Sequence, residues 1–192
     1  MISSILAFLL TVTTPAIPTA QVTPELVCAA QDAIRYRTPR WVPTTCQAVA
    51  GALNATAAPL LILAIIINES DLRPQVYAKH AGGIVDVGLM GIRCHLAGDK
   101  CTNWPVTGRT LQNLFDPAVN IEAGSRVLRR KQQQAGKHFL RAYNGGSKDH
   151  GYADRIHAIV AALEGRVTES SSARIRKLIL QLVEAARKIK QS

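Results

Sequence analysis

An uncharged apolar run from Leu60 to Asn68 (LLILAIIIN) constrains the fold more than any other part of the sequence. The run follows Pro59, has the length of a helix and is too apolar to face water, so we expect a buried core helix. Glu69 ends this run. Partial desolvation there raises the pKa of a carboxyl group and lets it hold a proton near neutral pH, as a general acid must. The alternative is a solvated glutamate that only ends a core helix.

The composition indicates one folded domain with a basic surface. Of the 192 residues, 47% are hydrophobic and 19% are charged, which argues against intrinsic disorder. A net charge of +10 predicts an anionic partner, either nucleic acid, anionic lipid or an acidic cell-wall polymer. Nucleic acid is disfavoured because only 5% of the residues are aromatic and no zinc-finger spacing or RNP-like motif is present.

Residues 1–20 are similar to a secretory signal peptide. A short apolar stretch from Ile5 to Leu10 is followed by Pro15, Pro18 and small residues up to Ala20, although no Lys or Arg precedes it. The two prolines and the short run argue against a membrane-spanning helix. We therefore expect export to the periplasm or the extracellular space, with a retained anchor or a buried first helix as alternatives.

Four cysteines agree with export. Cys28, Cys46, Cys94 and Cys101 allow three disulfide pairings, of which the local one, Cys28 with Cys46 and Cys94 with Cys101, closes the shortest loops. A zinc site using Cys94, His95 and Cys101 is disfavoured, because its spacing matches no Cys-x-x-Cys knuckle. In a reducing cytosol the four would instead be buried thiols.

The sequence predicts a mainly α-helical chain. Cap residues, prolines and apolar spacing predict helices at Pro24 to Ile34, Thr45 to Leu53, Pro59 to Glu69, Pro117 to about Gly136, Phe139 to Tyr143 and Tyr152 to Leu163. Between Tyr77 and Asn113 the chain is rich in glycine and is expected to be irregular, with one brief extended segment from Ile84 to Met90.

The C-terminal segment, residues 166–192, is distinct from the rest of the chain. Its apolar residues follow a 3.6-residue period: Ile175, Leu178, Ile179, Leu182, Val183, Ala186 and Ile189. The opposite face is rich in Lys and Arg, which predicts a basic amphipathic helix. Such a helix either packs on the domain with a solvated face or contacts a membrane surface, a wall polymer or an envelope partner.

Several short motifs follow the apolar run in a fixed order. They are Glu69-Ser70, Gly88-Leu89-Met90-x-Ile92, Asp116-Pro117 with Asn120-Ile121 and Gly124, Ala142-Tyr143-Asn144-Gly145, and Tyr152 with Ile156. In this order, they resemble the catalytic domain of the soluble lytic transglycosylases of bacteria and their phages, which has a lysozyme-like fold. The resemblance covers about residues 45–165 and implies a catalytic domain within residues 21–165.

The resemblance also implies roles for single residues. Glu69 matches the catalytic acid and base, and Ser70 matches a cleft residue that contacts the sugar or the glutamate. Met90 matches the residue on the glycan-binding floor. Tyr143 matches the tyrosine that orients the glutamate, and Asn144 matches a neighbouring cleft position.

The sequence departs from the family pattern at Gly91, where the family usually carries glutamine. This removes an expected polar contact to the glycan. Arg93 and His95 are candidates to replace that contact.

The resemblance implies a peptidoglycan lytic transglycosylase that acts on glycan strands and needs no cofactor or metal. Glu69 would protonate the leaving oxygen and then deprotonate the 6-hydroxyl of the sugar, which leaves a 1,6-anhydromuramoyl end. A muramidase would need a second carboxylate. Asp86 is the candidate, because Asp71 lies too near Glu69 in sequence to share its helix face. A non-catalytic wall- or membrane-binding protein with the same fold is the third possibility.

Overall fold

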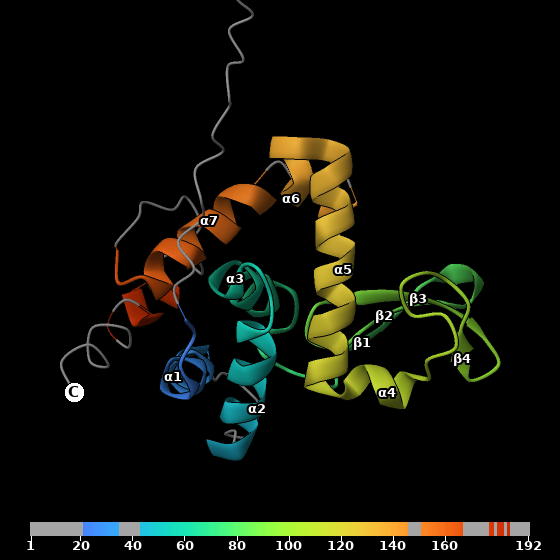
Figure 1. Cartoon of the computed structure of the whole chain (residues 1–192), viewed down its shortest axis with the longest axis horizontal. Coiled ribbons are helices and arrows are strands. Elements are labelled where there is room, and N and C mark those ends of the chain that lie inside the picture. The colour runs from blue at the N-terminus through green and yellow to red at the C-terminus, as the bar shows by residue number, and fades with distance from the viewer. Residues whose placement is uncertain are drawn as a thin grey trace, which may run out of the picture.

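The computed structural model describes residues 21–34, 43–145 and 151–166, together with 177, 178, 180–182 and 184. The expected signal peptide of residues 1–20 and most of the basic C-terminal segment lie outside these residues. The described chain is mainly helical with one small sheet (Figure 1). In Figure 1 the long helix α5 lies between the helices α1, α2, α3 and α7 on one side and the sheet on the other.

Four helices begin at a proline, which is favourable at the first helical position because its missing N–H has no helical partner there. They are α1 (Pro24–Ile34), α2 (Pro43–Asn54), α3 (Pro59–Ser70) and α5 (Pro117–Ala135). Helix α2 therefore begins at Pro43, earlier than the predicted start at Thr45, and a disulfide between Cys28 and Cys46 links it to α1.

Helix α3 is the buried helix that the apolar run predicts. Every residue from Pro59 to Ile67 is buried. The helix ends where Asp71 and Leu72 adopt positive φ angles of 50° and 56°. Both values are uncommon for residues other than glycine, and they change the direction of the chain at the end of α3, shortly after Glu69.

Helix α7 (Tyr152–Leu163) packs along α3 and completes the core on this side. Its buried face includes Tyr152, Ile156 and Ile159. This spacing places the three side chains on one side of the helix. Helices α3 and α7, which are far apart in the sequence, therefore meet through one apolar interface.

The glycine-rich segment is more regular than the sequence indicated. It forms a four-stranded antiparallel sheet in sequence order, β1 (Tyr77–Lys79), β2 (Ile84–Val87), β3 (Ile92–Ala97) and β4 (Lys100–Cys101), with a 3-10 turn, η1 (Ala81–Gly83), between β1 and β2. The strands are short and are joined by tight glycine turns, which leaves little strand periodicity in the sequence. A disulfide between Cys94 and Cys101 links β3 to β4, so these cysteines are not free to form the alternative zinc site.

The sequence analysis did not anticipate the short helix α4 (Leu111–Phe115). Its capping signal is present, since the Thr110 side chain accepts from the Asn113 N–H and the Asn113 side chain accepts from the Thr110 N–H. Asp116 then caps α5 by accepting a hydrogen bond from the Val119 N–H. After α5, the turn η2 (Gly136–His138) leads directly into α6 (Phe139–Tyr143).

In the C-terminal segment, the residues that the structure describes, 177, 178, 180–182 and 184, are helical. Leu182 is buried and Leu178 packs against the core. The boundary of the predicted basic helix at 166–192 stays a prediction, because most of it lies outside the described residues. No helix within the described ranges is both long and apolar enough to span a bilayer.

Candidate active site

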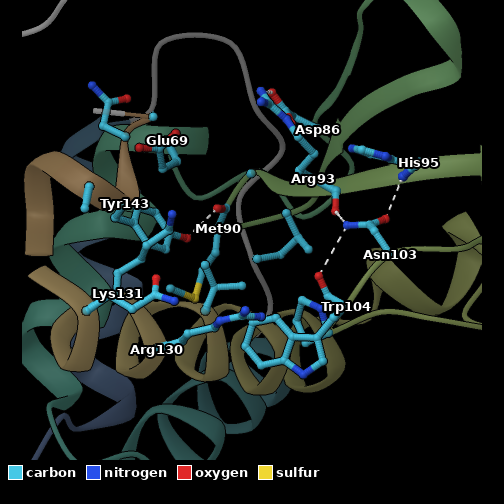
Figure 2. Close-up of a pocket in the computed structure, with 18 residues that line it drawn as sticks. Glu69, Asp86, Met90, Arg93, His95, Asn103, Trp104, Arg130, Lys131 and Tyr143 are labelled. Atoms are coloured by element: carbon cyan, nitrogen blue, oxygen red, sulfur yellow. Dashed lines mark hydrogen bonds and ion pairs between the residues drawn. The ribbon is translucent and has the colours of Figure 1, made fainter. Parts of the chain in front are cut away.

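An open cavity of about 530 Å³ lies between the end of α3, the turn between β2 and β3, helix α5 and the C-terminal end of α6 (Figure 2). Four of the predicted site residues line it: Glu69, Met90, Tyr143 and Asn144. The cavity therefore gathers side chains that are far apart in the sequence.

Glu69 lies at the end of the buried helix α3, half-buried, and its carboxylate accepts a hydrogen bond from the Tyr152 hydroxyl. The distance from the Tyr152 hydroxyl oxygen to Glu69 Oε1 is 2.7 Å. Burial raises the pKa of Glu69, and the negative charge of Asp86 adds to this, whereas hydrogen bonds from Tyr152 and Asn68 and the charge of Arg155 oppose it. The net result is a carboxyl group that retains its proton at a higher pH than an exposed glutamate.

Tyr152 is only 1% exposed and comes from α7. Burial and the nearby charge of Glu69 raise the pKa of the Tyr152 hydroxyl, so it stays protonated and acts as a hydrogen-bond donor. The packing of α7 against α3 holds Tyr152 in place, and its hydrogen bond thus fixes the orientation of the Glu69 carboxyl group. The sequence motifs do not predict this role for Tyr152.

The resemblance predicts Tyr143 as the tyrosine that orients Glu69. The Tyr143 hydroxyl donates instead to the main-chain oxygen of Met90, at 2.8 Å (Figure 2). Burial and the charge of Glu69 raise the pKa of Tyr143, which keeps this donor protonated as well. Tyr143 lines the cavity and braces its floor, whereas Tyr152 contacts the Glu69 carboxyl group.

Ser70 was predicted to contact the sugar or the glutamate, and the structure places it elsewhere. Its side chain is buried and donates to the main-chain oxygen of Ile66 at 2.9 Å, one turn back along α3. It does not line the cavity. This bond within its own helix satisfies the buried Ser70 hydroxyl group.

Asn120 on α5 fixes the turn that carries Met90. It is fully buried, and its side-chain amide donates to the main-chain oxygens of Val87 (3.0 Å) and Leu114 (2.9 Å). Its side-chain oxygen accepts from the Met90 N–H at 2.8 Å. Gly88 is needed beside it, because a Cβ there would lie 2.1 Å from the Asn120 side-chain nitrogen.

Met90 forms the floor of the cavity and is itself fully buried. Its side chain packs against Gly124 of α5, where a Cβ would lie 2.2 Å from the Met90 sulfur. A glycine in the middle of a helix costs about 0.5–1 kcal/mol relative to alanine. A residue larger than glycine does not fit at position 124, because α5 approaches Met90 too closely there.

Gly91 is the position at which the sequence departs from the family. Its φ angle of 57° is unfavourable for any other residue type, and a Cβ there would lie 3.3 Å from Glu69 Oε2. The absence of a side chain leaves this oxygen open to the cavity. Arg93 and His95 also line the cavity, but from β3 rather than beside Glu69.

Asp86 lines the cavity as well, and it has two hydrogen-bonding partners, Arg93 and His80. Arg93 donates to both of its carboxylate oxygens, at 3.0 and 3.1 Å, and the His80 ring nitrogen lies 2.7 Å from Asp86 Oδ2. Burial acts to raise the pKa of Asp86, but these hydrogen bonds and charges outweigh it and leave the pKa lowered. Asp86 is therefore an ionised carboxylate whose two oxygens both have partners.

The far wall of the cavity is the chain after β4, and Asn103 holds it in place. The Asn103 side-chain oxygen accepts from the His95 N–H at 2.7 Å, and its nitrogen donates to the main-chain oxygen of Arg93 at 2.8 Å. These bonds join the wall to β3 and present Trp104 at the end of the cavity (Figure 2). Sequence reasoning missed this wall, since a single Asn-Trp pair in a loop carries no recognisable signal.

Comparison with known proteins assigns the chain to a family. No curated protein and no solved structure matches it. A family model, the transglycosylase SLT domain, matches residues 49–159, which is more than half of the chain and includes Glu69, the Met90 turn and Tyr152. The chain therefore belongs to the transglycosylase SLT domain family, whose activity is that of peptidoglycan lytic transglycosylases.

Proposed function

We propose that this protein cleaves the β-1,4 bond between N-acetylmuramic acid and N-acetylglucosamine and leaves 1,6-anhydromuramoyl ends, with Glu69 as acid and then base. The observation that carries the proposal is the Glu69–Tyr152 hydrogen bond at the edge of the cavity, at 2.7 Å. The hydrogen bond fixes the orientation of a carboxyl group whose pKa is raised by burial, and a general acid needs both properties.

The proposed reaction needs one carboxyl group of the enzyme. Protonated Glu69 gives its proton to the glycosidic oxygen as the bond from that oxygen to C1 breaks, while the substrate's N-acetyl group stabilises C1. The 6-hydroxyl oxygen of the same sugar then bonds to C1, and the Glu69 carboxylate takes the proton that this hydroxyl releases. Glu69 ends the cycle protonated, and no water is consumed.

The pairing of Asp86 supports this route over hydrolysis. A second catalytic carboxylate must either attack C1 or activate a water molecule, and both need an available oxygen. Arg93 and His80 contact both oxygens of Asp86 and lower its pKa, which makes it a weak base. Because Asp86 nevertheless lines the cavity, a muramidase that uses it is the alternative to test.

Mass spectrometry of the products from purified sacculi separates the two reactions. The proposed route gives muramic acid ends that are lighter by one water and lack a reducing group. Reducing ends as the main product would replace the proposal with the muramidase reaction. A folded protein that releases no fragments would instead favour the non-catalytic wall-binding role.

The proposal includes export, because the substrate lies outside the cytoplasm and the two disulfides need an oxidising compartment. Fractionation of cells that express the full chain tests this, and a protein retained in the cytosol would contradict it. The basic segment at 166–192 is proposed to contact the membrane surface or an envelope partner. Co-sedimentation of the full chain with anionic and neutral vesicles tests the first of these contacts.

A further inference from the structure

The α5 side of the cavity carries two cations, and an exposed aromatic ring lies at one end of it. Trp104 is 48% exposed, and the Arg130 guanidinium lies 4.8 Å from the centre of a Trp104 ring. Lys131 lines the same cavity. Figure 2 shows Arg130 beside Trp104, with Lys131 on the same helix nearer to Tyr143. The proposed reaction uses none of these three side chains.

The geometry of α5 directs both cations into the cavity. Val127, Arg130, Lys131 and Gln134 all line it, and their spacing of three, four and seven residues defines one face of a helix. The side chains of this face therefore reach the cavity together. Arg129, which precedes Arg130 in the sequence, is exposed and does not line the cavity.

The charged groups on the two sides of the cavity differ in their pairing. Near Glu69, Asp86 is contacted by Arg93 and His80. On the α5 side, neither Arg130 nor Lys131 forms an ion pair with any residue that the structure describes. The positive charge of these two side chains therefore remains uncompensated.

The contact with Trp104 also prepares Arg130 to bind an anion. Stacking uses the flat face of the guanidinium group and leaves the N–H groups at its edge available for paired hydrogen bonds to a carboxylate. A guanidinium held against a ring loses less conformational freedom on binding than a mobile one. Lys131 adds a second charge on the same helix face.

We propose that Arg130 and Lys131 form a binding site for the carboxylates of the peptides attached to the glycan strand. This inference rests on the proposed function, because it concerns the same cavity and substrate. The sugars adjoining the scissile bond are otherwise uncharged, so the peptides are the substrate groups that match these cations. The site would make binding depend on the peptide as well as on the sugar backbone.

Binding measured in the Glu69→Gln variant tests the proposal without cleavage. The probes are glycan strands from sacculi with their peptides intact and the same strands after their peptide carboxylates have been converted to neutral amides. We expect the strands with free peptide carboxylates to bind more tightly, by about tenfold or more, as charge-assisted hydrogen bonds in a partly open site allow. Adding Arg130→Gln and Lys131→Gln together should erase this difference by weakening the binding of the strands with free peptide carboxylates.

Arg129→Gln is the matched control, because it removes the same charge from the same helix outside the cavity. It should preserve the preference for strands with free peptide carboxylates. The proposal is overturned if the protein shows no preference, or if the preference survives the double substitution. Product analysis on the wild-type protein tests the proposed reaction independently, so either idea can fail without the other.

Discussion

The two sides of the cavity are held in place in different ways. On one side, Glu69 and Tyr152 belong to helices whose apolar faces are buried against each other, so the core positions the acid. On the other side, the wall that carries Trp104 is held by exposed hydrogen bonds of Asn103 and by the disulfide between Cys94 and Cys101.

This difference separates catalysis from binding in physical terms. Changes at the acid act through a rigid, cooperative core, where a misplaced carboxyl group cannot be corrected by local movement. Changes in the wall act through a few short-range links and leave the acid in place. We therefore expect substitutions on the core side to lower kcat, and substitutions on the wall side to raise KM.

The largest effect is expected for Glu69→Gln, which keeps the shape of the side chain but cannot transfer a proton. Turnover should fall by about a hundred- to ten-thousand-fold. The folded state raises the pKa of Glu69, so the stability this provides is present at low pH and is lost as the pH rises through that pKa. The melting temperature should therefore fall less with rising pH in the variant than in the wild-type protein. Near wild-type turnover in the variant would end the assignment of Glu69 as the acid.

The comparison between the two tyrosines sharpens the view of the core side. Tyr152→Phe removes a hydrogen bond to a carboxylate, and kcat should fall by about ten- to a hundredfold, whereas Tyr143→Phe removes a bond to a main-chain oxygen and should cost about fivefold or less.

The pH profile identifies the cause. The Tyr152 hydrogen bond lowers the pKa of Glu69, so its loss raises that pKa further, and the decline of the rate on the alkaline side should move to higher pH. The opposite ranking of the two variants would mean that Tyr143 orients the acid.

The two disulfides offer a matched test across the molecule. Replacing Cys28 and Cys46 by serine should lower the free energy of unfolding by about 3 kcal/mol, and replacing Cys94 and Cys101 by slightly less, because the pairs are 18 and 7 residues apart. Only the second change loosens the wall, so only it should raise KM severalfold. Equal KM values in the two folded variants would break the comparison between core and wall.

The smallest effect is expected for Asp86→Asn. The negative charge of Asp86 raises the pKa of Glu69, so the variant should have a lower Glu69 pKa and an alkaline decline at lower pH. At the optimum, turnover should change by about threefold or less, as for other partly exposed charges. Loss of most activity would instead identify Asp86 as a second catalytic carboxylate.

The sequence predicts well the parts of the structure that depend on long patterns. The apolar run ending at Glu69 and the periodicity from Tyr152 to Leu163 fixed two helices, because many residues contribute to each signal. β2 lies within the extended segment predicted from Ile84 to Met90. The other short strands and α4 were missed, since their stability comes from turns, a disulfide and packing against α5 rather than from their own composition.

The candidate site was predicted as a set of residues more accurately than as a set of roles. Glu69, Met90, Tyr143 and Asn144 all line the cavity, but spacing along a chain cannot tell which tyrosine hydroxyl reaches a given oxygen. Ser70 shows the same difficulty, because its neighbour Glu69 faces the cavity while its own side chain turns into the helix. Such assignments depend on χ angles, which no sequence motif records.

The contacts between the Gly88–Met90 turn and α5 have an evolutionary consequence. Gly88 faces Asn120 and Met90 faces Gly124, each at a separation that leaves no room for an added methyl group. A substitution at one position of either pair is therefore tolerated only with a compensating change at the other. Among homologous sequences, positions 88 and 120, and positions 90 and 124, should vary in concert, so the turn and the helix are inherited as one unit.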